Sequence, residues 1–375
     1  MGICETENNK EYNTQNNIAL NQQYLQYENQ GFNQNMTYYM PVENLGEIDD
    51  GTRYEGDLRN GIKEGKGIEY YKNGGRYEGE FKNNKRDGKG IFYHSNGDIY
   101  EGEFKNGKRE GKGTFISNKD QWKGDRYVGD WKNGYQEGKG IYYHNNGERY
   151  EGDYKRNHRE GKGIFYFNSG DIYVGDWKNG NKEGKGIYYY KSGDRYEGDY
   201  KNGFKEGKGI FYCNTDPFKG DRYVGDWKKG VKEGKGIYYH NNGDRYEGDY
   251  KNDKKEGKGI FYWNNYPFKG DRYIGDWKNG VKEGKGIYYH NSGERYEGDY
   301  KNDKKEGEGI FYYKSGDVYE GDYKNGQREG KGIYYFKTGE RYEGDYKNDK
   351  RDGQGIYYNK SGNREIQNYS NGARI

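Results

Sequence analysis

The chain has 375 residues, of which only 29% are hydrophobic and 48 are tyrosines, and this composition excludes a conventional aliphatic core. An aromatic content of 18% is nevertheless too high for a disordered polar chain. The 65 basic and 62 acidic residues nearly cancel, which argues against nucleic-acid binding and for charged faces that pair with each other.

The compartment follows from what the sequence lacks. It contains no secretory signal and no run of 18 apolar residues, so we expect neither secretion nor a membrane span. The two cysteines, Cys4 and Cys213, are too few for a disulfide framework. These features predict a protein of a reducing compartment.

Residues 1–50 form an acidic leader, with eight acids and one lysine. The opening MGICET places Gly2 and Thr6 as the N-myristoylation signal M-G-x-x-x-[ST] requires. One myristoyl chain binds membranes only marginally, and the acidic flank would be repelled by anionic lipid. We therefore expect Cys4, a candidate for S-palmitoylation, to supply the second anchor, so that membrane lipids are partners through the acyl chains. A chance match to the short pattern is the alternative.

The rest of the leader predicts a flexible, disordered tether. Residues 7–50 contain sixteen Asn and Gln and one Pro. A segment so poor in apolar residues cannot bury enough surface to offset the entropy lost on folding.

After the leader, residues 51–363 repeat one pattern thirteen times. Nine of the twelve spacings between successive repeats are 23 residues and three are 27. With the Tyr of each Y-x-G as position 1, the repeats begin at Tyr54, Tyr77, Tyr100, Tyr127, Tyr150, Tyr173, Tyr196, Tyr223, Tyr246, Tyr273, Tyr296, Tyr319 and Tyr342.

Each repeat predicts a β-hairpin. In the repeat from Tyr196, the run to Tyr200 alternates ring, charge and glycine with the period of a strand. Asn-Gly then indicates a turn, and GIFY at 209–212 a second strand. We therefore predict an all-β protein, an elongated single-layer antiparallel meander.

Strand parity predicts which residues share a face. Tyr196, Gly198 and Tyr200 should lie on one side, joined by Gly207 and Gly209, so that rings cover bare glycine backbone. Phe211 and Cys213 share this parity. The other face should carry charges of both signs within cross-strand reach.

A second rhythm runs through pairs of repeats. Trp occupies position 5 of the fourth, sixth, eighth and tenth repeats, and Val or Ile occupies position 2 of the same repeats. The pattern indicates growth by duplication of hairpin pairs.

The three 27-residue repeats carry four extra residues in the turn between hairpins. Trp122, Phe218 and Phe268 stand in these turns and should project from one edge of the meander. They are candidate partner anchors. The alternative is that each ring folds back over a hairpin end.

Enzyme and cofactor sites are not expected. Four of the five histidines occupy position 18, and even the nearest are two hairpins apart, too far to share a metal, so edge packing is the better interpretation. The G-K-G strings lack P-loop spacing. We predict no catalytic residue, metal, cofactor, small-molecule substrate or nucleic-acid partner. The last residues, 364–375, keep only Tyr369 and an Asn-Gly turn and read as a degenerate cap.

The repeat resembles the MORN (membrane occupation and recognition nexus) family, whose motif is Y-x-G-x-[WY]-x-x-G-x-x-x-G-x-G. Residues 173–186, YVGDWKNGNKEGKG, match it throughout. The resemblance implies a β-ribbon scaffold of membrane junctions, cell cortex or cilia.

We therefore expect a non-enzymatic scaffold at the cytoplasmic face of the plasma membrane or of an internal or cortical membrane, with unknown protein partners. One alternative is a phosphoinositide or anionic-lipid module that uses the lysines at positions 6, 10 and 13. Another is a ciliary or cytoskeletal component.

Overall fold

A computed structural model describes residues 52–375. The predicted disordered leader and both predicted acylation positions, Gly2 and Cys4, lie outside these residues. The described part consists of 28 β-strands and a short 3-10 helix, η1 (Asp120–Trp122), and it contains no α-helix. Accordingly, none of its helices is long and apolar enough to cross a membrane.

The described residues form two compact units, one of residues 52–219 and 228–230 and the other of residues 220–227 and 231–375. The strands of the first unit are β1 (Arg53–Arg59), β2 (Ile62–Tyr70), β3 (Arg76–Lys82), β4 (Lys85–Tyr93), β5 (Ile99–Lys105), β6 (Lys108–Ile116), β7 (Arg126–Lys132), β8 (Tyr135–Tyr143), β9 (Arg149–Lys155), β10 (His158–Tyr166), β11 (Ile172–Lys178), β12 (Asn181–Tyr189), β13 (Arg195–Lys201) and β14 (Phe204–Tyr212). After β15 (Arg222–Lys228), the second unit continues with β16 (Val231–Tyr239), β17 (Arg245–Lys251), β18 (Lys254–Tyr262), β19 (Arg272–Lys278), β20 (Val281–Tyr289), β21 (Arg295–Lys301), β22 (Lys304–Tyr312), β23 (Val318–Lys324), β24 (Gln327–Tyr335), β25 (Arg341–Lys347), β26 (Lys350–Tyr358), β27 (Arg364–Ser370) and β28 (Ala373–Arg374).

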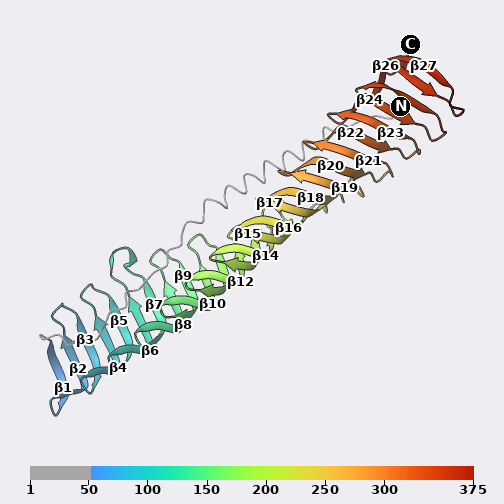
Figure 1. Cartoon of the computed structure of the whole chain (residues 1–375). Helices are drawn as coiled ribbons and strands as arrows, with labels where there is room; N and C mark the ends of the chain where they lie inside the picture. Colours follow the sequence, from blue (N-terminus) through green and yellow to red (C-terminus); the bar gives the residue numbers. More distant parts are fainter. Residues whose placement is uncertain (1–51) are drawn as a thin grey trace. The chain divides into compact units, whose positions relative to one another are not determined.

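Within each unit, every strand pairs antiparallel with its neighbours in the chain. This holds from β1 to β14 in the first unit. It holds from β16 to β28 in the second. Each unit is therefore a single-layer meander (Figure 1), and the predicted all-β fold class is confirmed.

The hairpin turn explains the Asn-Gly of the repeat. In the hairpin of β13 and β14, Asn202 and Gly203 have φ angles of 49° and 87°. Lys201 and Phe204 on either side of them form the last pair of the ladder. Two successive positive φ angles are typical of a type I′ turn, whose twist matches that of the strands and which favours Asn followed by Gly.

A bulge follows each turn and breaks the alternation of the second strand. In this hairpin, Gly198 pairs with Gly209 but Tyr200 pairs with Lys205, so residues 206–208 lie opposite the single residue Asp199. The Asp199 carboxylate accepts the backbone N–H of Lys208 at 3.1 Å. A donor that the bulge removes from the ladder is thereby satisfied.

The bulge corrects one sequence prediction. Gly207 has a φ of 67°, and a Cβ added there would lie 3.0 Å from the Asp199 carboxylate, on the side opposite the rings. The prediction that Gly207 shares a face with Tyr196 is therefore wrong. Parity holds only where the strand alternates, and a bulge inserts residues that interrupt it.

The last hairpin lacks the repeat motif. Asn371 and Gly372 form its turn, with φ angles of 50° and 90°. The ring of Tyr369 meets that of Tyr342 edge to face, with centroids 5.4 Å apart. The last described strands therefore cover the ring of the thirteenth repeat.

Candidate functional site

The tyrosine at position 1 forms the core of the second to thirteenth repeats, whereas Tyr54 of the first repeat is half-buried. Tyr196 has no exposed surface, and its hydroxyl donates to the carbonyl oxygen of Asp199 at 3.1 Å. A Cβ on Gly198 or Gly209 would lie 2.5 or 2.4 Å from this hydroxyl, so the ring lies directly on both glycines. Burial raises the pKa of Tyr196, which keeps the hydroxyl protonated as a donor. The same full burial is found at Tyr77, Tyr100, Tyr127, Tyr150, Tyr173, Tyr223, Tyr246, Tyr273, Tyr296, Tyr319 and Tyr342.

The ring at position 5 joins neighbouring repeats. Tyr200 meets Tyr196 edge to face at 5.3 Å, and it meets Tyr173 of the preceding repeat at 5.1 Å. Trp177 makes the same two contacts, and its indole N–H also donates to the carbonyl of Gly163 at 3.2 Å. Because each ring packs on the repeat before it, stability depends on interfaces between neighbours.

Position 10 places a cation among these rings. Lys205 is only 7% exposed, and its Nζ lies 5.2 Å from the centroid of Tyr196 and 4.9 Å from that of Phe211. These are cation–π distances. The position-10 lysine was one of the three proposed lipid ligands. The low exposure of Lys205 argues against that role, because a side chain enclosed by rings is poorly placed to reach a lipid headgroup.

Two other lysines at position 10 have pKa values well below the ordinary value. Nζ of Lys182 lies 4.9 Å from the ring centroid of Tyr188, and that of Lys255 lies 4.4 Å from Phe261. Burial lowers the pKa of Lys182 to about 7, and Lys205 and Arg159 add to the effect. Burial lowers the pKa of Lys255 to about 8, although the carboxylate of Asp303 opposes it. Both therefore titrate near physiological pH.

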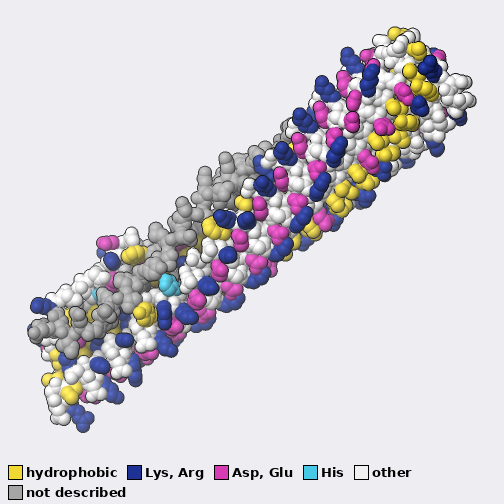
Figure 2. Space-filling view, viewed as in Figure 1, with side chains coloured by type: hydrophobic (Ala, Val, Ile, Leu, Met, Phe, Trp, Pro, Cys, Tyr) yellow, Lys and Arg dark blue, Asp and Glu magenta, His cyan; other side chains and the backbone are white. Residues whose placement is uncertain are grey.

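The opposite face of the sheet, here called the outer face, carries paired charges. Lys185 at position 13 pairs with Asp199 of the next repeat at 2.5 Å. Arg195, which precedes position 1, lies over the ring of Tyr212 at 4.4 Å and pairs with Glu197 at 3.6 Å. Figure 2 shows the resulting alternation of basic and acidic side chains. Such exposed pairs add little stability, but they leave these rows without excess positive charge for anionic lipid.

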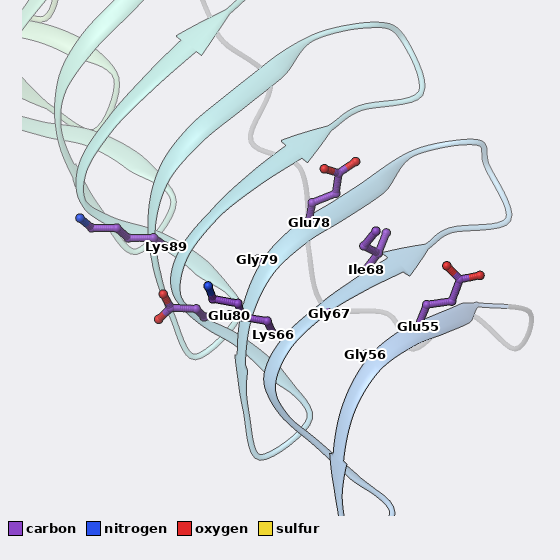
Figure 3. A pocket seen from close by; sticks show the side chains of 9 residues that line it. All are labelled: Glu55, Gly56, Lys66, Gly67, Ile68, Glu78, Gly79, Glu80 and Lys89. Carbon is purple, nitrogen blue, oxygen red and sulfur yellow. The ribbon is translucent and has the colours of Figure 1, made fainter.

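An open hollow of about 370 Å³ lies on the outer face of the first repeats. The strands bend where their glycines lie, so that side chains on the two sides of the bend splay apart (Figure 3). Its lining residues are Glu55, Gly56, Lys66, Gly67, Ile68, Glu78, Gly79, Glu80 and Lys89. All of them are ordinary positions of the repeat, so the hollow does not indicate a dedicated ligand.

Each inserted turn ends in an aspartate whose buried carboxylate accepts hydrogen bonds from the next hairpin. Asp125 accepts the hydroxyl of Tyr142 and the backbone N–H of Asn145, both at 2.8 Å. Nδ1 of His144 lies 3.5 Å from the same carboxylate. Burial alone would raise the pKa of Asp125, but the hydrogen bonds outweigh it and the pKa lies below its ordinary value.

The position-18 histidines pack on the position-16 rings. The ring of His144 lies 4.5 Å from that of Tyr142, and His240 lies 4.6 Å from Tyr238. Burial lowers the pKa of His240 to about 3, which keeps its imidazole neutral. Across residues 52–375, no three potential metal ligands gather at one place.

The inserted turns place the three predicted anchors differently. Trp122 and Phe268 are half-buried, whereas Phe218 is only 9% exposed. The burial of Phe218 fits the alternative that the ring covers a hairpin end. Partner binding by these residues stays a prediction.

The repeats were also compared with known proteins. A family profile described as MORN repeat matches residues 54–76, 77–99, 100–120, 127–149, 150–172, 173–195, 196–216, 223–245, 246–266, 273–295, 296–318, 319–341 and 342–364. The chain belongs to the MORN repeat family. No curated protein matched this MORN chain.

Two solved structures illustrate the remaining likeness. The TCP domain of Drosophila melanogaster SAS-4 (dCPAP), in complex with a proline-rich motif of Ana2 (dSTIL), is 14% identical; the match covers 44% of this chain and 85% of that one, with a TM-score of 0.28. The TCP10 domain of Danio rerio CPAP, in complex with a STIL peptide, is 12% identical, with 62% and 96% covered and a TM-score of 0.25. At these scores, neither likeness bears on the function of the MORN array.

Two features of the MORN array escaped the sequence analysis. Tyr266, in the third inserted turn, is 88% exposed and is the ring that projects most plainly. Its position before Pro267, in a turn already singled out, was the available signal. The enclosed position-10 cations were missed because lysine was taken as a solvent residue, although position 10 has the parity of the ring at Phe211.

Proposed function

We propose that this MORN array is a non-enzymatic protein-interaction scaffold, held at the cytoplasmic face of a membrane by acylation at Gly2 and Cys4. The observation that carries the proposal is the leader MGICET placed before thirteen copies of one interaction hairpin. The array supplies a regular surface, and the acyl chains supply the membrane affinity. Two chains are needed because one gives only marginal binding.

The charge pattern supports acyl anchoring over direct lipid binding. Lysines at position 13 are paired with aspartates, as Lys185 is with Asp199, and Lys205 at position 10 is enclosed. Positions 6 and 13 are therefore both exposed, as at Lys201 and Lys185, but the position-13 lysine has an acidic partner. A single row of lysines beside acidic rows is a weak attraction for anionic lipid.

The test is alkyne-myristate labelling and membrane fractionation of cells that express wild type, Gly2→Ala or Cys4→Ser. We expect labelled wild type in the membrane pellet, unlabelled and soluble Gly2→Ala, and Cys4→Ser that is labelled but largely soluble. Cys213→Ser is the matched control and should stay in the pellet. Unlabelled, soluble wild type would contradict the proposal and favour the ciliary or cytoskeletal alternative.

A further inference from the structure

On the outer face, one row of the first unit is built from arginines and tyrosines. The arginine that precedes position 1 lies over the tyrosine at position 17 of the same hairpin, as Arg76 lies over Tyr93 at 3.9 Å. Where position 2 is glutamate, its carboxylate pairs with that arginine, as Glu78 pairs with Arg76 at 2.5 Å. A complete repeat therefore contributes a stacked and neutralised pair to this row.

The third repeat interrupts the row with two isoleucines. Ile99 and Ile116 occupy the arginine and tyrosine positions and pair with each other across the hairpin of β5 and β6. Ile116 is 39% exposed and Ile99 is half-buried. Among the thirteen described repeats, Ile116 is the one residue at position 17 that is not tyrosine. An accessible apolar pair thus replaces the stacked pair in this repeat.

The next arginine in the row lacks its carboxylate. Arg126 pairs with Ile116 on one side and with Tyr143 on the other, and it lies over the Tyr143 ring at 4.5 Å. Position 2 of this repeat is Val128 instead of glutamate. Arg126 is exposed, and no carboxylate of residues 52–375 forms an ion pair with it. We call Ile99, Ile116 and Arg126 the Ile–Ile–Arg strip.

The strip fits a segment that carries aliphatic side chains near β5 and β6 and a carboxylate near β7. Aliphatic side chains would cover the isoleucines, and a carboxylate would complete Arg126 as Glu78 completes Arg76. Glu101, in the adjacent row of β5, disfavours an acid there, because Ile99 stands in place of its arginine. One guanidinium is too little positive charge to hold a nucleic acid or an anionic membrane.

The leader contains a segment of this chemistry directly before β1. Residues 43–50 read ENLGEIDD, which is four of the eight leader acids together with Leu45 and Ile48. Counted back from β1, both aliphatic residues come before Glu43. Counted away from β1, the strip has the matching order, since its two isoleucines come before the arginine.

The distances along the row agree with this order. The row starts at Arg53 on β1 and reaches Ile99 on β5, Ile116 on β6 and Arg126 on β7. At normal strand spacing these three residues lie roughly 19, 24 and 29 Å from Arg53. A polyproline II chain advances about 3.1 Å per residue and turns residues three apart, such as 45 and 48, to the same side. Positions 48, 45 and 43 would then lie roughly 16, 25 and 31 Å from Arg53.

We propose that residues 43–50 of the leader dock on the Ile–Ile–Arg strip of their own chain. Ile48 and Leu45 cover the two isoleucines, and Glu43 pairs with Arg126. The contact is small, but its attachment to β1 gives the segment an effective concentration in the millimolar range, so that a weak contact suffices. This docking is independent of the acyl anchor and involves different residues.

The experiment is hydrogen–deuterium exchange with mass spectrometry on the unacylated full chain, in reductant, over a concentration series. Relative to intrinsic rates, the amides of residues 43–50 should exchange about tenfold more slowly than those of residues 7–40, to the same extent at every concentration. The double variant Ile99→Arg, Ile116→Tyr installs residues that other repeats carry at these positions and should abolish the protection. Unchanged exchange in β5 and β6 verifies that this variant is folded.

A charge exchange tests the ion pair separately. Arg126→Glu should weaken the protection of residues 43–50, and adding Glu43→Arg to the same chain should restore it. Two matched controls change the same position in other repeats, Ile172→Arg in the sixth and Arg272→Glu in the tenth. Both should leave the protection as in wild type.

Three results would overturn the proposal. The first is a wild type in which residues 43–50 exchange as fast as the rest of the leader, which would leave the strip to a partner protein. The second is protection that survives the double variant, since the leader would then contact another surface. The third is protection that increases with concentration, which would mean that the leader binds a second copy instead of its own chain.

Discussion

The ring of Tyr196 occupies the space in which a side chain on Gly209 would lie, since a Cβ there would be 2.4 Å from the tyrosine hydroxyl oxygen. The tyrosine is fully buried and its hydroxyl is bonded to the Asp199 carbonyl, so the ring has little freedom to yield. This one contact accounts for the glycine at position 14 of the repeat. It also couples the two strands of the hairpin through a side chain.

We expect Gly209→Ala to lower the free energy of unfolding by about 3 kcal/mol, because overpacking a filled core displaces the ring. Urea denaturation of the full chain, followed by tryptophan fluorescence, measures the change. Gly293→Ala is the matched control: it lies in a turn with a φ of 97° and open space around its Cβ. At Gly293 only the strain of a positive φ applies, so Gly293→Ala should lower the free energy of unfolding by about 1 kcal/mol. Equal losses at the two sites would contradict the packing account.

The enclosed lysines predict a rise of stability with pH. The pKa of Lys182 is about 7 and that of Lys255 about 8 in the folded chain, against an ordinary value of 10.5. Below pH 7 both states are protonated and the cost of burying the charges is fully present. Between these pKa values and 10.5 the unfolded chain holds more protons, so stability increases with pH.

We expect wild type to gain about 4 kcal/mol of unfolding free energy between pH 6 and pH 9, about two pKa units from Lys182 and one from Lys255. The double variant Lys182→Gln, Lys255→Gln should lose most of this gain, and Gln136 shows that a repeat accommodates glutamine at this position. Lys201→Gln, at an exposed position, serves as the control and should keep the wild-type slope. Identical slopes in all three proteins would show that the lysines are solvated.

The sequence predicted most of the fold because its period is short and its faces alternate. Tyr196, Gly198 and Tyr200 obey strand parity, so the ring core could be assigned without coordinates. Parity failed at Gly207, because the bulge gives this residue a positive φ and a Cβ added to it would point to the face opposite the rings. No single-residue propensity marks a bulge in a sequence so rich in glycine.

The candidate surfaces were less accessible to sequence analysis. A lysine at position 10 is read as exposed unless the surrounding rings are known, and rings from two strands enclose Lys205. The burial of Phe218 and the exposure of Tyr266 depend on how each inserted turn folds back. These are tertiary contacts that neither composition nor periodicity contains.

Tyr238 donates a hydrogen bond to Asp221, and we expect Tyr238→Phe to lower the free energy of unfolding by an amount that depends on pH. The hydroxyl donates at 2.7 Å to a carboxylate that is 3% exposed, and burial raises the pKa of Asp221. Tyr238→Phe removes a donor from this buried charge and should cost about 1–3 kcal/mol at pH 7.

The cost should shrink as the pH falls toward 4, because a raised folded-state pKa lets Asp221 become neutral before it would in the unfolded chain. Urea unfolding at pH 7 and pH 4.5 measures both values. Tyr357→Phe, at the same position of the thirteenth repeat and half-buried, is the control and should change stability little. A loss that is independent of pH would mean that the carboxylate does not depend on the tyrosine.

Two of the inserted turns carry aromatic rings in opposite environments, one packed against the protein and one projecting into solvent. Phe218 is 9% exposed and Tyr266 is 88% exposed, although both stand beside a proline in equivalent turns. Phe218→Ala should lower the unfolding free energy by about 3 kcal/mol, as expected when a buried ring is removed. Tyr266→Ala should change it by less than about 0.5 kcal/mol.

Limited proteolysis of the two turns provides an independent measurement. Phe218→Ala should make residues 213–222 more sensitive to cleavage, because the ring fastens that turn to the hairpin end, whereas Tyr266→Ala should leave residues 263–272 as sensitive as in wild type. If Phe218→Ala instead leaves both stability and cleavage unchanged, the ring is not a packing residue. The prediction that Phe218 anchors a partner would then become the better account of its place in the turn.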